Sequence, residues 1–464
     1  MTRMRDYTGS PAEVPMNNAA AAAKIPRNEA DIPDVAVIGA GASGCMAAAS
    51  AAMEGAEVLL IDANDKICRK IYATGNGRCN LTNLRLSQDP VLGDLYHVGG
   101  GEDLTAFFSR FSVDDHIAFW ELNGIRLHDR QGYVYPRTDQ ASTIAEAYEK
   151  ILRRLNVKIV LSQRVVGLGL IRGWKDRDGS VCDIFKIETN NGGPYYARTV
   201  ILAGGGMAGP QYGCRGDMYG LAAQFGHTVT RPLPALVQLL SDDKSLKASS
   251  GVRCDAKITL FIDGEPVCSD SGELQMTEKG ISGIPAFQLS AMAARALEDR
   301  KEALAEVDFL PEFTVKEWEP EIERRLREDR NCMLSVFFLG LVNRKILDLV
   351  LRRRGLQAEK KAAKLSDAEL TAIMRDLRTL RVRIKGTGTF EQAQVTSGGI
   401  PLSETDGGLQ SKKQPGLYMA GELLDVDGLC GGYNLQWAAT SGRIAGIGAA
   451  KACKALQGKV HGTP

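Results

Sequence analysis

The sequence predicts an α/β fold of several domains, and three glycine-rich segments far apart along the chain are the basis for this prediction. The first, at 34–44, consists of a short apolar run, a glycine turn and the start of an alanine-rich helix. The segments 199–206 and 416–435 also begin with apolar, strand-like runs and continue into glycines. Buried strands that end in glycine turns are typical of doubly wound parallel sheets.

The first glycine turn predicts a dinucleotide-binding, Rossmann-like unit. Gly39 permits the tight turn, Gly41 lets the backbone approach a pyrophosphate, and Gly44 lets the helix pack close to the sheet. Free N–H groups at the helix N-terminus favour an anion. A second strand then ends in an acid, which can accept hydrogen bonds from an adenosine ribose. The predicted contacts here are Gly39, Gly41, Ala42, Ser43, Gly44 and Asp62.

Length and composition limit the possible classes of protein. A chain of 464 residues is expected to form about two or three domains. The net charge of +1 favours neither a nucleic-acid-binding nor a membrane-surface protein. No run of apolar residues is long enough to span a bilayer, and the N-terminus lacks a signal-peptide pattern, so we expect a cytoplasmic protein. The ten cysteines and five histidines show no metal-ligand spacing, and we expect no metal site.

The two later glycine segments favour FAD over a nicotinamide as the bound dinucleotide, because FAD is long and needs contacts from several segments. The strand that ends at 203–205 is expected to pass beneath the cofactor. The later segment is expected to reach the ribityl chain through Glu422 or Asp427 and the flavin pyrimidine through a helix N-terminus, whose dipole stabilises reduced flavin. The predicted contacts are Ala203, Gly204, Gly205, Gly421, Glu422, Asp427, Gly432, Tyr433, Asn434 and Leu435.

Three longer motifs carry a resemblance to a known family. They lie at 69–83, 420–428 and 431–436, and they resemble the aminoacetone oxidase family of FAD-binding enzymes, from about residue 33 to 456. That family includes flavoproteins associated with the reduction of unsaturated 3-oxo bile acids. The resemblance implies tight, non-covalent FAD binding and adds these contacts: Arg69, Lys70, Asn76, Gly77, Arg78, Cys79, Asn80 and, through the backbone at the adenine, Val165 or Val166.

The resemblance also implies a division into three parts. A discontinuous, Rossmann-like FAD domain of the two-dinucleotide-fold type is expected at 32–206 and 391–464, after a flexible N-terminal extension at 1–31. A β-barrel-like insert is expected at 207–310 and 381–390, with a helical subdomain at 311–380. Many relatives carry a histidine where Glu278 stands, so histidine chemistry in that loop does not transfer to this chain.

The predicted activity is two-electron hydride transfer by a flavoprotein oxidoreductase. We expect NAD(P)H to bind transiently, because the chain has only one dinucleotide fingerprint, and to reduce an activated double bond or carbonyl in an apolar, ketone-like small molecule. Three alternatives stay open: an oxygen-dependent amino-ketone oxidase, a flavoprotein that acts on tRNA through the basic run 352–364, and a non-catalytic redox sensor. The catalytic residues and the oligomeric state are unassigned. Tyr433, Arg137 and Cys79 are possible proton donors.

Overall fold

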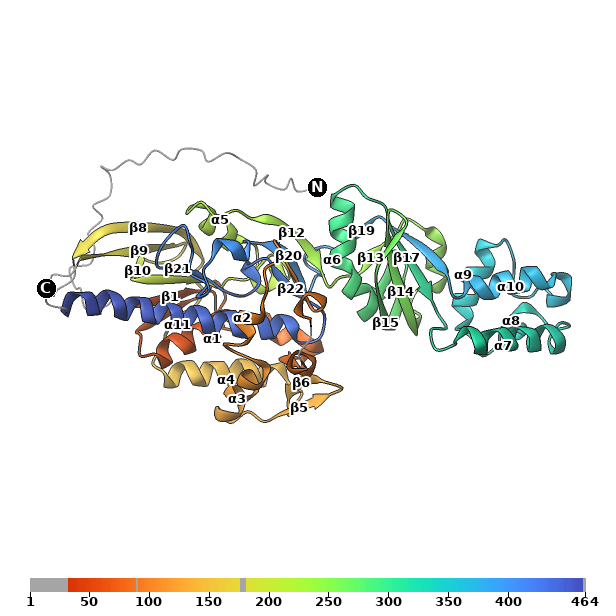
Figure 1. Ribbon diagram of the computed structural model, residues 1–464, viewed down its shortest axis with the longest axis horizontal. Coiled ribbons are helices and arrows are strands. Elements are labelled where there is room, and N and C mark those ends of the chain that lie inside the picture. The colour runs from red at the N-terminus through yellow and green to blue at the C-terminus, as the bar shows by residue number, and fades with distance from the viewer. Residues whose placement is uncertain (1–31, 89–90, 176–180, 462–464) are drawn as a thin grey trace.

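A five-stranded parallel sheet forms the centre of the first domain, and the strands come from both ends of the chain. The computed structural model describes residues 32–88, 91–175 and 181–461 (Figure 1), so the predicted extension at 1–31 lies outside the described residues. The strand order is β21 (Leu417–Met419), β11 (Thr199–Leu202), β1 (Val35–Ile38), β2 (Val58–Ile61) and β7 (Lys158–Val160). All four pairings are parallel. The predicted Rossmann-type α/β class is confirmed.

Helices and small antiparallel sheets surround this parallel sheet. The helices are α1 (Ala42–Met53), α2 (Thr105–Phe108), α3 (Val113–Leu122), α4 (Ala141–Arg154), α5 (Asp217–Ala223) and α11 (Tyr433–His461). The antiparallel strands are β8 (Val165–Lys175), β9 (Val181–Thr189) and β10 (Tyr195–Ala197) in one sheet, β3 (Thr82–Asn83), β5 (Leu127–Arg130) and β6 (Tyr133–Pro136) in another, and the pair β4 (Tyr96–Val98) and β22 (Val426–Gly428).

The region between β11 and β21 holds a separate antiparallel sheet, which lies beside the first domain in Figure 1. Its seven strands run in the order β18 (Leu380–Ile384), β17 (Ala303–Asp308), β14 (Arg253–Ile262), β15 (Glu265–Thr277), β16 (Gly280–Gly283), β13 (Leu239–Leu240) and β19 (Gly386–Thr387). Helix α6 (Ile284–Glu298) packs on this sheet. The pair β12 (Thr230–Ala235) and β20 (Val395–Gly399) consists of the strands that lead into the insert and back out of it.

Four helices lie in the chain between strands β17 and β18 of the insert sheet and share its hydrophobic core. They are α7 (Val315–Glu328), α8 (Leu334–Phe337), α9 (Arg344–Arg353) and α10 (Asp367–Asp376). The shorter 3₁₀ helices of the chain are η2 (Ile71–Gly77), η3 (Leu84–Ser87), η4 (Leu92–Asp94), η5 (Pro210–Tyr212), η6 (Lys244–Ser249), η7 (Ala362–Lys364), η8 (Leu402–Glu404) and η9 (Gly421–Leu423). In the part of the chain that the structure describes, no helix combines the length and apolarity needed to span a membrane.

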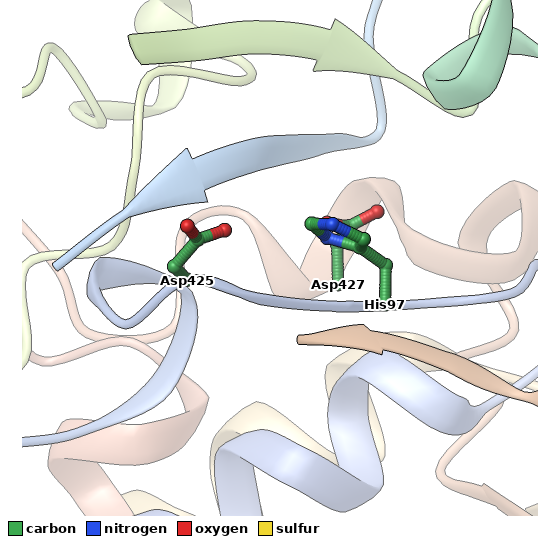
Figure 2. Close-up of side chains that lie close together, drawn as sticks. All are labelled: His97, Asp425 and Asp427. Atoms are coloured by element: carbon green, nitrogen blue, oxygen red, sulfur yellow. The ribbon is translucent and has the colours of Figure 1, made fainter. Parts of the chain in front are cut away.

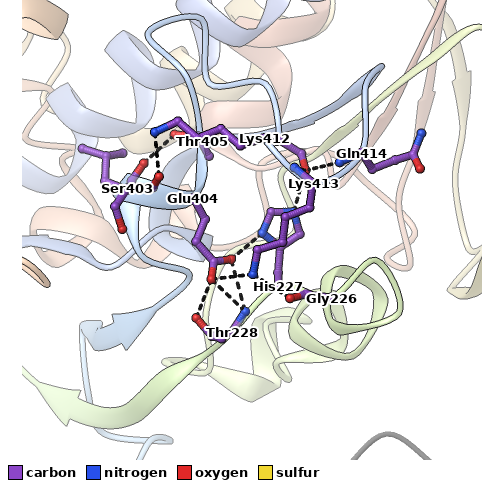
Figure 3. A network of polar contacts seen from close by, with 11 residues as sticks. Gly226, His227, Thr228, Ser403, Glu404, Thr405, Lys412, Lys413 and Gln414 are labelled. Atoms are coloured by element: carbon purple, nitrogen blue, oxygen red, sulfur yellow. Dashed lines mark hydrogen bonds and ion pairs between the residues drawn. The ribbon is translucent and has the colours of Figure 1, made fainter.

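A buried polar network fixes the loop that precedes β21 (Figure 3). His227 Nδ1 lies 2.6 Å from Glu404 Oε2, and its Nε2 lies 2.7 Å from Ser411 Oγ. The order serine, histidine, acid is that of a hydrolase triad. Ser411 Oγ is buried, however, and also accepts the backbone N–H groups of Lys413 and Gln414, so it is not free to attack a substrate. We interpret this network as a clamp that stabilises the loop.

Close packing of α11 on α1 joins the C-terminal helix to the N-terminal unit. A Cβ atom on Gly442 would lie 2.3 Å from Ser43 O, and a Cβ on Gly446 would lie 2.3 Å from Ala47 O. A step of four residues towards the C-terminus of α11, from Gly442 to Gly446, corresponds to a step of four towards the C-terminus of α1, from Ser43 to Ala47. The two helices therefore run parallel to each other. Only glycine at these two positions lets the backbones approach this closely.

We therefore predict that Gly446→Ala lowers the free energy of unfolding by about 1–3 kcal/mol, because the added methyl group forces the helices apart. Gly220→Ala in α5 is the matched control, since its added Cβ meets no atom within 4 Å and alanine favours the helix. Circular dichroism during thermal unfolding measures both variants. Equal midpoints for the two would contradict this account of the packing.

Candidate functional site

The first glycine turn is tightly packed on one side and open on the other. Gly39 has a φ of +105°, and a Cβ there would lie 2.6 Å from Ala203 O. A Cβ on Gly44 would lie 1.7 Å from Gly39 O. At Gly41, in contrast, no atom lies within 4 Å of the Cβ position. This open side, next to the N–H groups of the first residues of α1, Ala42 and Ser43, has room for a phosphate group.

Asp62 follows β2 and turns its carboxylate back to this turn. Its Oδ2 accepts the Ala40 N–H at 2.6 Å, and its Oδ1 accepts the Asn64 N–H at 2.7 Å. The half-buried carboxylate is thus fixed in orientation by backbone donors. Each oxygen can accept further hydrogen bonds, as recognition of a ribose requires.

The second glycine segment continues from β11 and connects the first turn to the third segment. A Cβ on Gly204 would lie 2.6 Å from Met218 Cγ, and Gly205 has a φ of +76°. The side chains of Thr396 and Glu422 pack directly against the next residue, Gly206. A Cβ there would lie 2.5 Å from Thr396 Oγ1 and 3.1 Å from Glu422 Oε1. The three glycine segments therefore meet in one region of the structure.

An ion pair between Lys70 and Glu422 links segments 352 residues apart at this meeting point. Lys70 Nζ lies 2.7 Å from Glu422 Oε2, while Thr396 donates its N–H and its hydroxyl to Glu422 Oε1 at 2.9 and 2.8 Å. Burial alone would lower the pKa of Lys70, but the Glu422 carboxylate raises it above its ordinary value. Lys70 therefore stays cationic and can attract an anionic cofactor.

The segment after Lys70 has an unusual backbone, with φ of +55° at Asn76, +83° at Gly77 and +62° at Cys79. Asn76, Gly77 and Arg78 are exposed, whereas Cys79 and Asn80 are buried. Among the residues that the structure describes, Asn80 Oδ1 has no hydrogen-bond partner, so a polar ligand would satisfy it. Burial raises the pKa of the Cys79 thiol to about 12, which makes this thiol a poor proton donor near neutral pH.

The N-terminus of α11 lies next to Asn80. Gly432, with a φ of +97°, would place a Cβ 2.9 Å from Asn80 Oδ1. Tyr433 is buried, and the side chain of Asn434 bonds the N–H and the carbonyl of Gly428 at 2.8 Å each. Leu435 is half-buried in the first turn of the helix. The loop and the helix start are thus held rigidly, with the positive end of the helix dipole beside an unpaired acceptor.

The parallel packing of α1 and α11 sets the distance between the two helix N-termini. Gly442 faces Ser43, the second residue of α1, so residue 441 is level with the start of α1. Helix α11 begins at Tyr433, eight residues earlier. Eight residues correspond to about 12 Å along a helix axis. A phosphate at α1 and a flavin ring at α11 would be separated by the ribityl arm, and the open Gly41, the unpaired Asn80 and the cationic Lys70 fit FAD in this orientation.

Four of the predicted cofactor contacts do not join the residues around the three glycine segments. Arg69 pairs with Asp65 at the surface at 2.5 Å. On β8, Val165 is buried and the side chain of Val166 is exposed, so only their backbones could reach an adenine. Asp427 does not join Glu422; its Oδ1 lies 3.0 Å from His97 Nδ1 and 3.1 Å from the guanidinium of Arg295.

Figure 2 shows that Asp425 and Asp427 project to the same side of the segment 425–427 as His97. Sequence reasoning missed His97 and Arg295, since neither stands in a recognisable motif, and it gave Thr396 no contact with Glu422. They come close to Asp427 or Glu422 only when β4, α6 and β20 pack together.

Comparisons with known proteins agree with a Rossmann-type nucleotide domain. A family model described as the HI0933-like protein Rossmann domain matches residues 33–448. The chain is 36% identical over 421 residues to the 3-dehydro-bile acid delta(4,6)-reductase of Clostridium scindens, which covers 90% of this chain and 99% of that protein. It is 29% identical to the ribosomal RNA dihydrouridine synthase of Haemophilus influenzae, over 87% of this chain and 95% of that protein.

Among solved structures, 3-ketosteroid delta1-dehydrogenase from Sterolibacterium denitrificans, in complex with 1,4-androstadiene-3,17-dione, has a TM-score of 0.46 to this chain. The two are 12% identical, over 90% of this chain and 99% of that chain. This similarity is too distant to bear on the reaction.

We predict that Gly41→Val abolishes FAD retention without unfolding the protein, because the side chain would fill the open side of the turn, where the Cβ position has no atom of the described, non-adjacent residues within 4 Å. The absorbance of purified protein near 450 nm measures retention, and circular dichroism of FAD-free protein measures folding. Gly44→Val is the comparison, since its side chain would enter the Gly39 backbone and should destabilise the fold itself. Full FAD occupancy in Gly41→Val would contradict the assignment of this turn.

A second prediction concerns pH and the start of α11. His116 is buried, its Nδ1 lies 3.0 Å from Gln436 Oε1, and burial lowers its pKa to about 4. The unfolded chain, with an ordinary pKa near 6.5, binds a proton that the folded chain does not. Stability is therefore complete above about pH 6.5 and falls by about 2 kcal/mol between pH 7.5 and 5.

Replacement of the titrating group tests this. His116→Phe should be less stable at pH 7.5, because Gln436 Oε1 loses its partner, but it should lose less stability on acidification than the unsubstituted protein. Denaturant unfolding at pH 7.5, 6 and 5 gives the free energy of unfolding of each protein as a function of pH, and the slopes of the two curves are compared. Parallel slopes would show that another group controls the acid sensitivity.

Proposed function

The chain belongs to the HI0933-like family of Rossmann-domain proteins and is an FAD-dependent oxidoreductase, and on this premise we propose that it carries out an NAD(P)H-dependent reduction. The substrate is an activated double bond or carbonyl in an apolar, ketone-like small molecule, such as a bile-acid-like enone. Bound FAD supplies hydride transfer, while the protein binds, orients and shields the reacting groups from water.

The names of two relatives with different substrates carry this proposal. A 3-dehydro-bile acid delta(4,6)-reductase removes double bonds conjugated to a ketone, and a dihydrouridine synthase saturates the uracil double bond that is conjugated to a carbonyl. The reaction type common to both is reduction of a carbon–carbon double bond activated by a carbonyl. The relative with the higher identity, 36%, acts on a small molecule, so we favour a small-molecule substrate here.

The contacts around the glycine segments support roles for particular residues. Lys70 and the N-terminus of α1 would neutralise the pyrophosphate, and Asp62 would bind the adenosine ribose. Glu422, fixed by Thr396, would accept from the ribityl hydroxyls. The start of α11 would stabilise negative charge on the reduced flavin. The chain has a single dinucleotide fingerprint, so NAD(P)H would bind and leave in each turnover.

Reduction of a base in RNA is the second candidate, favoured by the 29% identity to a ribosomal RNA dihydrouridine synthase. It needs a basic surface for phosphates. In the basic run 352–364, Arg353 pairs with Asp243, and Arg354 lies 2.6 Å from Asp376 Oδ2. These carboxylates reduce the positive charge available to RNA, although Arg352, Lys361 and Lys364 stay exposed. Salt-dependent retention on ribosomal RNA would favour this candidate.

We predict that anaerobic mixing with NADH or NADPH bleaches the flavin absorbance, and that a steroid-type enone then restores it. Stopped-flow spectroscopy gives the two rates separately. The reduced pyridine nucleotide that bleaches faster is the donor, and the acceptor that gives the fastest recovery defines the substrate class. Uridine-containing RNA and oxygen are tested as acceptors in parallel.

Other outcomes would support the alternatives. Bleaching by an amino ketone without nicotinamide, followed by recovery with oxygen, would support an amino-ketone oxidase. No reduction by NADH, NADPH or an amino ketone would support a redox sensor that keeps FAD as a structural group. Purified protein that cannot be reconstituted with FAD would contradict the whole proposal.

A further inference from the structure

A cluster of charged side chains, of which only Asp427 is among the predicted cofactor contacts, lies between the first domain and the insert. It consists of His97 on β4, Asp425 before β22, Asp427 on β22 and Arg295 on α6 (Figure 2 shows the first three). The segment that carries both aspartates connects η9, which contains Glu422, to the start of α11. The cluster is therefore attached directly to the two elements expected to contact the ribityl chain and the flavin, and α6 of the insert adds its arginine.

We propose that His97 is the proton donor of the reduction and that Asp427 is its positioning residue. His97 Nδ1 lies 3.0 Å from Asp427 Oδ1, so Nδ1–H donates to the carboxylate. Among the described residues, Nε2 of His97 has no hydrogen-bond partner, and 36% of the side chain is exposed. An imidazole held through one nitrogen and accessible through the other is suited to proton transfer.

The surrounding charges support this role. Asp427 is 7% exposed, and its Oδ1 also accepts from the Arg295 guanidinium at 3.1 Å, which in turn bonds Ser397 Oγ. The carboxylate thus cannot rotate away from His97. Asp425 is fully buried, and neither of its oxygens makes a well-formed hydrogen bond, although the Thr230 hydroxyl is near. Asp427 and Arg295 thus hold the imidazole through Nδ1 and leave Nε2 as the nitrogen that can donate a proton.

The step balances within the proposed function, on which this inference rests. Bound FAD, once reduced by NAD(P)H, would supply the hydride that forms the new C–H bond at the β-carbon of the conjugated double bond. The π electrons move towards the carbonyl, and a new C–H bond then forms at the α-carbon with the proton from Nε2 of His97. The N–H bond breaks, its electron pair stays on the imidazole, and solvent returns a proton to Nε2.

The same side chains also have the composition of a cation site, because a ligand atom of His97, Asp425 and Asp427 lies within 4.8 Å of each of the others. Arg295 already places a positive charge on Asp427 Oδ1. A divalent cation bound to the same oxygen would be repelled by this guanidinium. The geometry therefore favours proton transfer over metal binding.

The test uses His97→Gln in the FAD-loaded protein and measures each half-reaction separately. Bleaching by NAD(P)H should be unchanged, while flavin recovery with the enone should slow by about 100-fold or more. Recovery with the unsubstituted protein should slow at high pH, where the donor loses its proton, and this dependence should disappear in the variant. The charged groups that face His97 are Asp427, Asp425 and Arg295.

Two further variants separate chemistry from structure. His97→Ala should recover part of its rate with added imidazole, which a purely structural role would not allow. Asp427→Asn should slow enone-dependent recovery by about 10-fold or more with FAD content unchanged. His128→Gln is the matched control: His128 lies on β5, its Nε2 lies 3.0 Å from Asp139 Oδ1, and it should be replaceable without effect on the rate.

The outcomes are distinguishable from those that test the proposed function. If the unsubstituted protein reduces no enone or uracil substrate, the proposed function fails. If it does reduce one and His97→Gln recovers at the same rate with the same pH dependence, the proton-donor role is wrong. Loss of activity with a chelator and its return with Zn²⁺ or Mn²⁺ would also overturn it, in favour of a cation site.

Discussion

The close parallel packing of α11 on α1 is the constraint on which the rest of the site depends. It rests on Gly442 and Gly446, whose missing side chains let the backbones of the two helices meet. Gly421 follows the same rule, since a Cβ there would lie 2.4 Å from Ser43 Oγ. Its N–H also binds Ser441 Oγ at 2.9 Å. The two helix N-termini thereby point the same way at a fixed offset, as a long dinucleotide with anionic groups at two places requires.

This arrangement explains why the insert can be large without disturbing the cofactor region. The chain leaves the first domain through β12 and returns through β20, and these two strands pair with each other. The insert sheet and the four helices between its strands β17 and β18 have a hydrophobic core of their own. Arg295 on α6 nevertheless reaches Asp427 of the first domain. The insert can therefore vary in substrate contacts while one of its residues still takes part in the polar cluster.

Sequence reasoning was most effective where backbone geometry restricts the residue type. The glycines at 39 and 44 are dictated by contacts shorter than 3 Å, and Asp62 follows from the spacing of the βαβ unit. Such positions predict the parallel sheet and the first half of the cofactor region. Side chains that meet across domains, such as Lys70 with Glu422, could be named as separate contacts. Their pairing over 352 residues could not be derived from local pattern.

His97 and Arg295 illustrate what local pattern leaves out. Each is a single polar residue in an ordinary strand or helix. Only its contact with Asp427, which another strand contributes, indicates a functional role. Asp427 was predicted as the alternative to Glu422 for the ribityl contact, but its carboxylate contacts His97 on β4 and Arg295 on α6. Reactions that add a hydride to one carbon need a proton at the next. His97 on β4, held by Asp427 of the segment between the expected ribityl and flavin contacts, would meet that requirement whichever substrate carries the double bond, so the chemistry can be retained while the substrate changes.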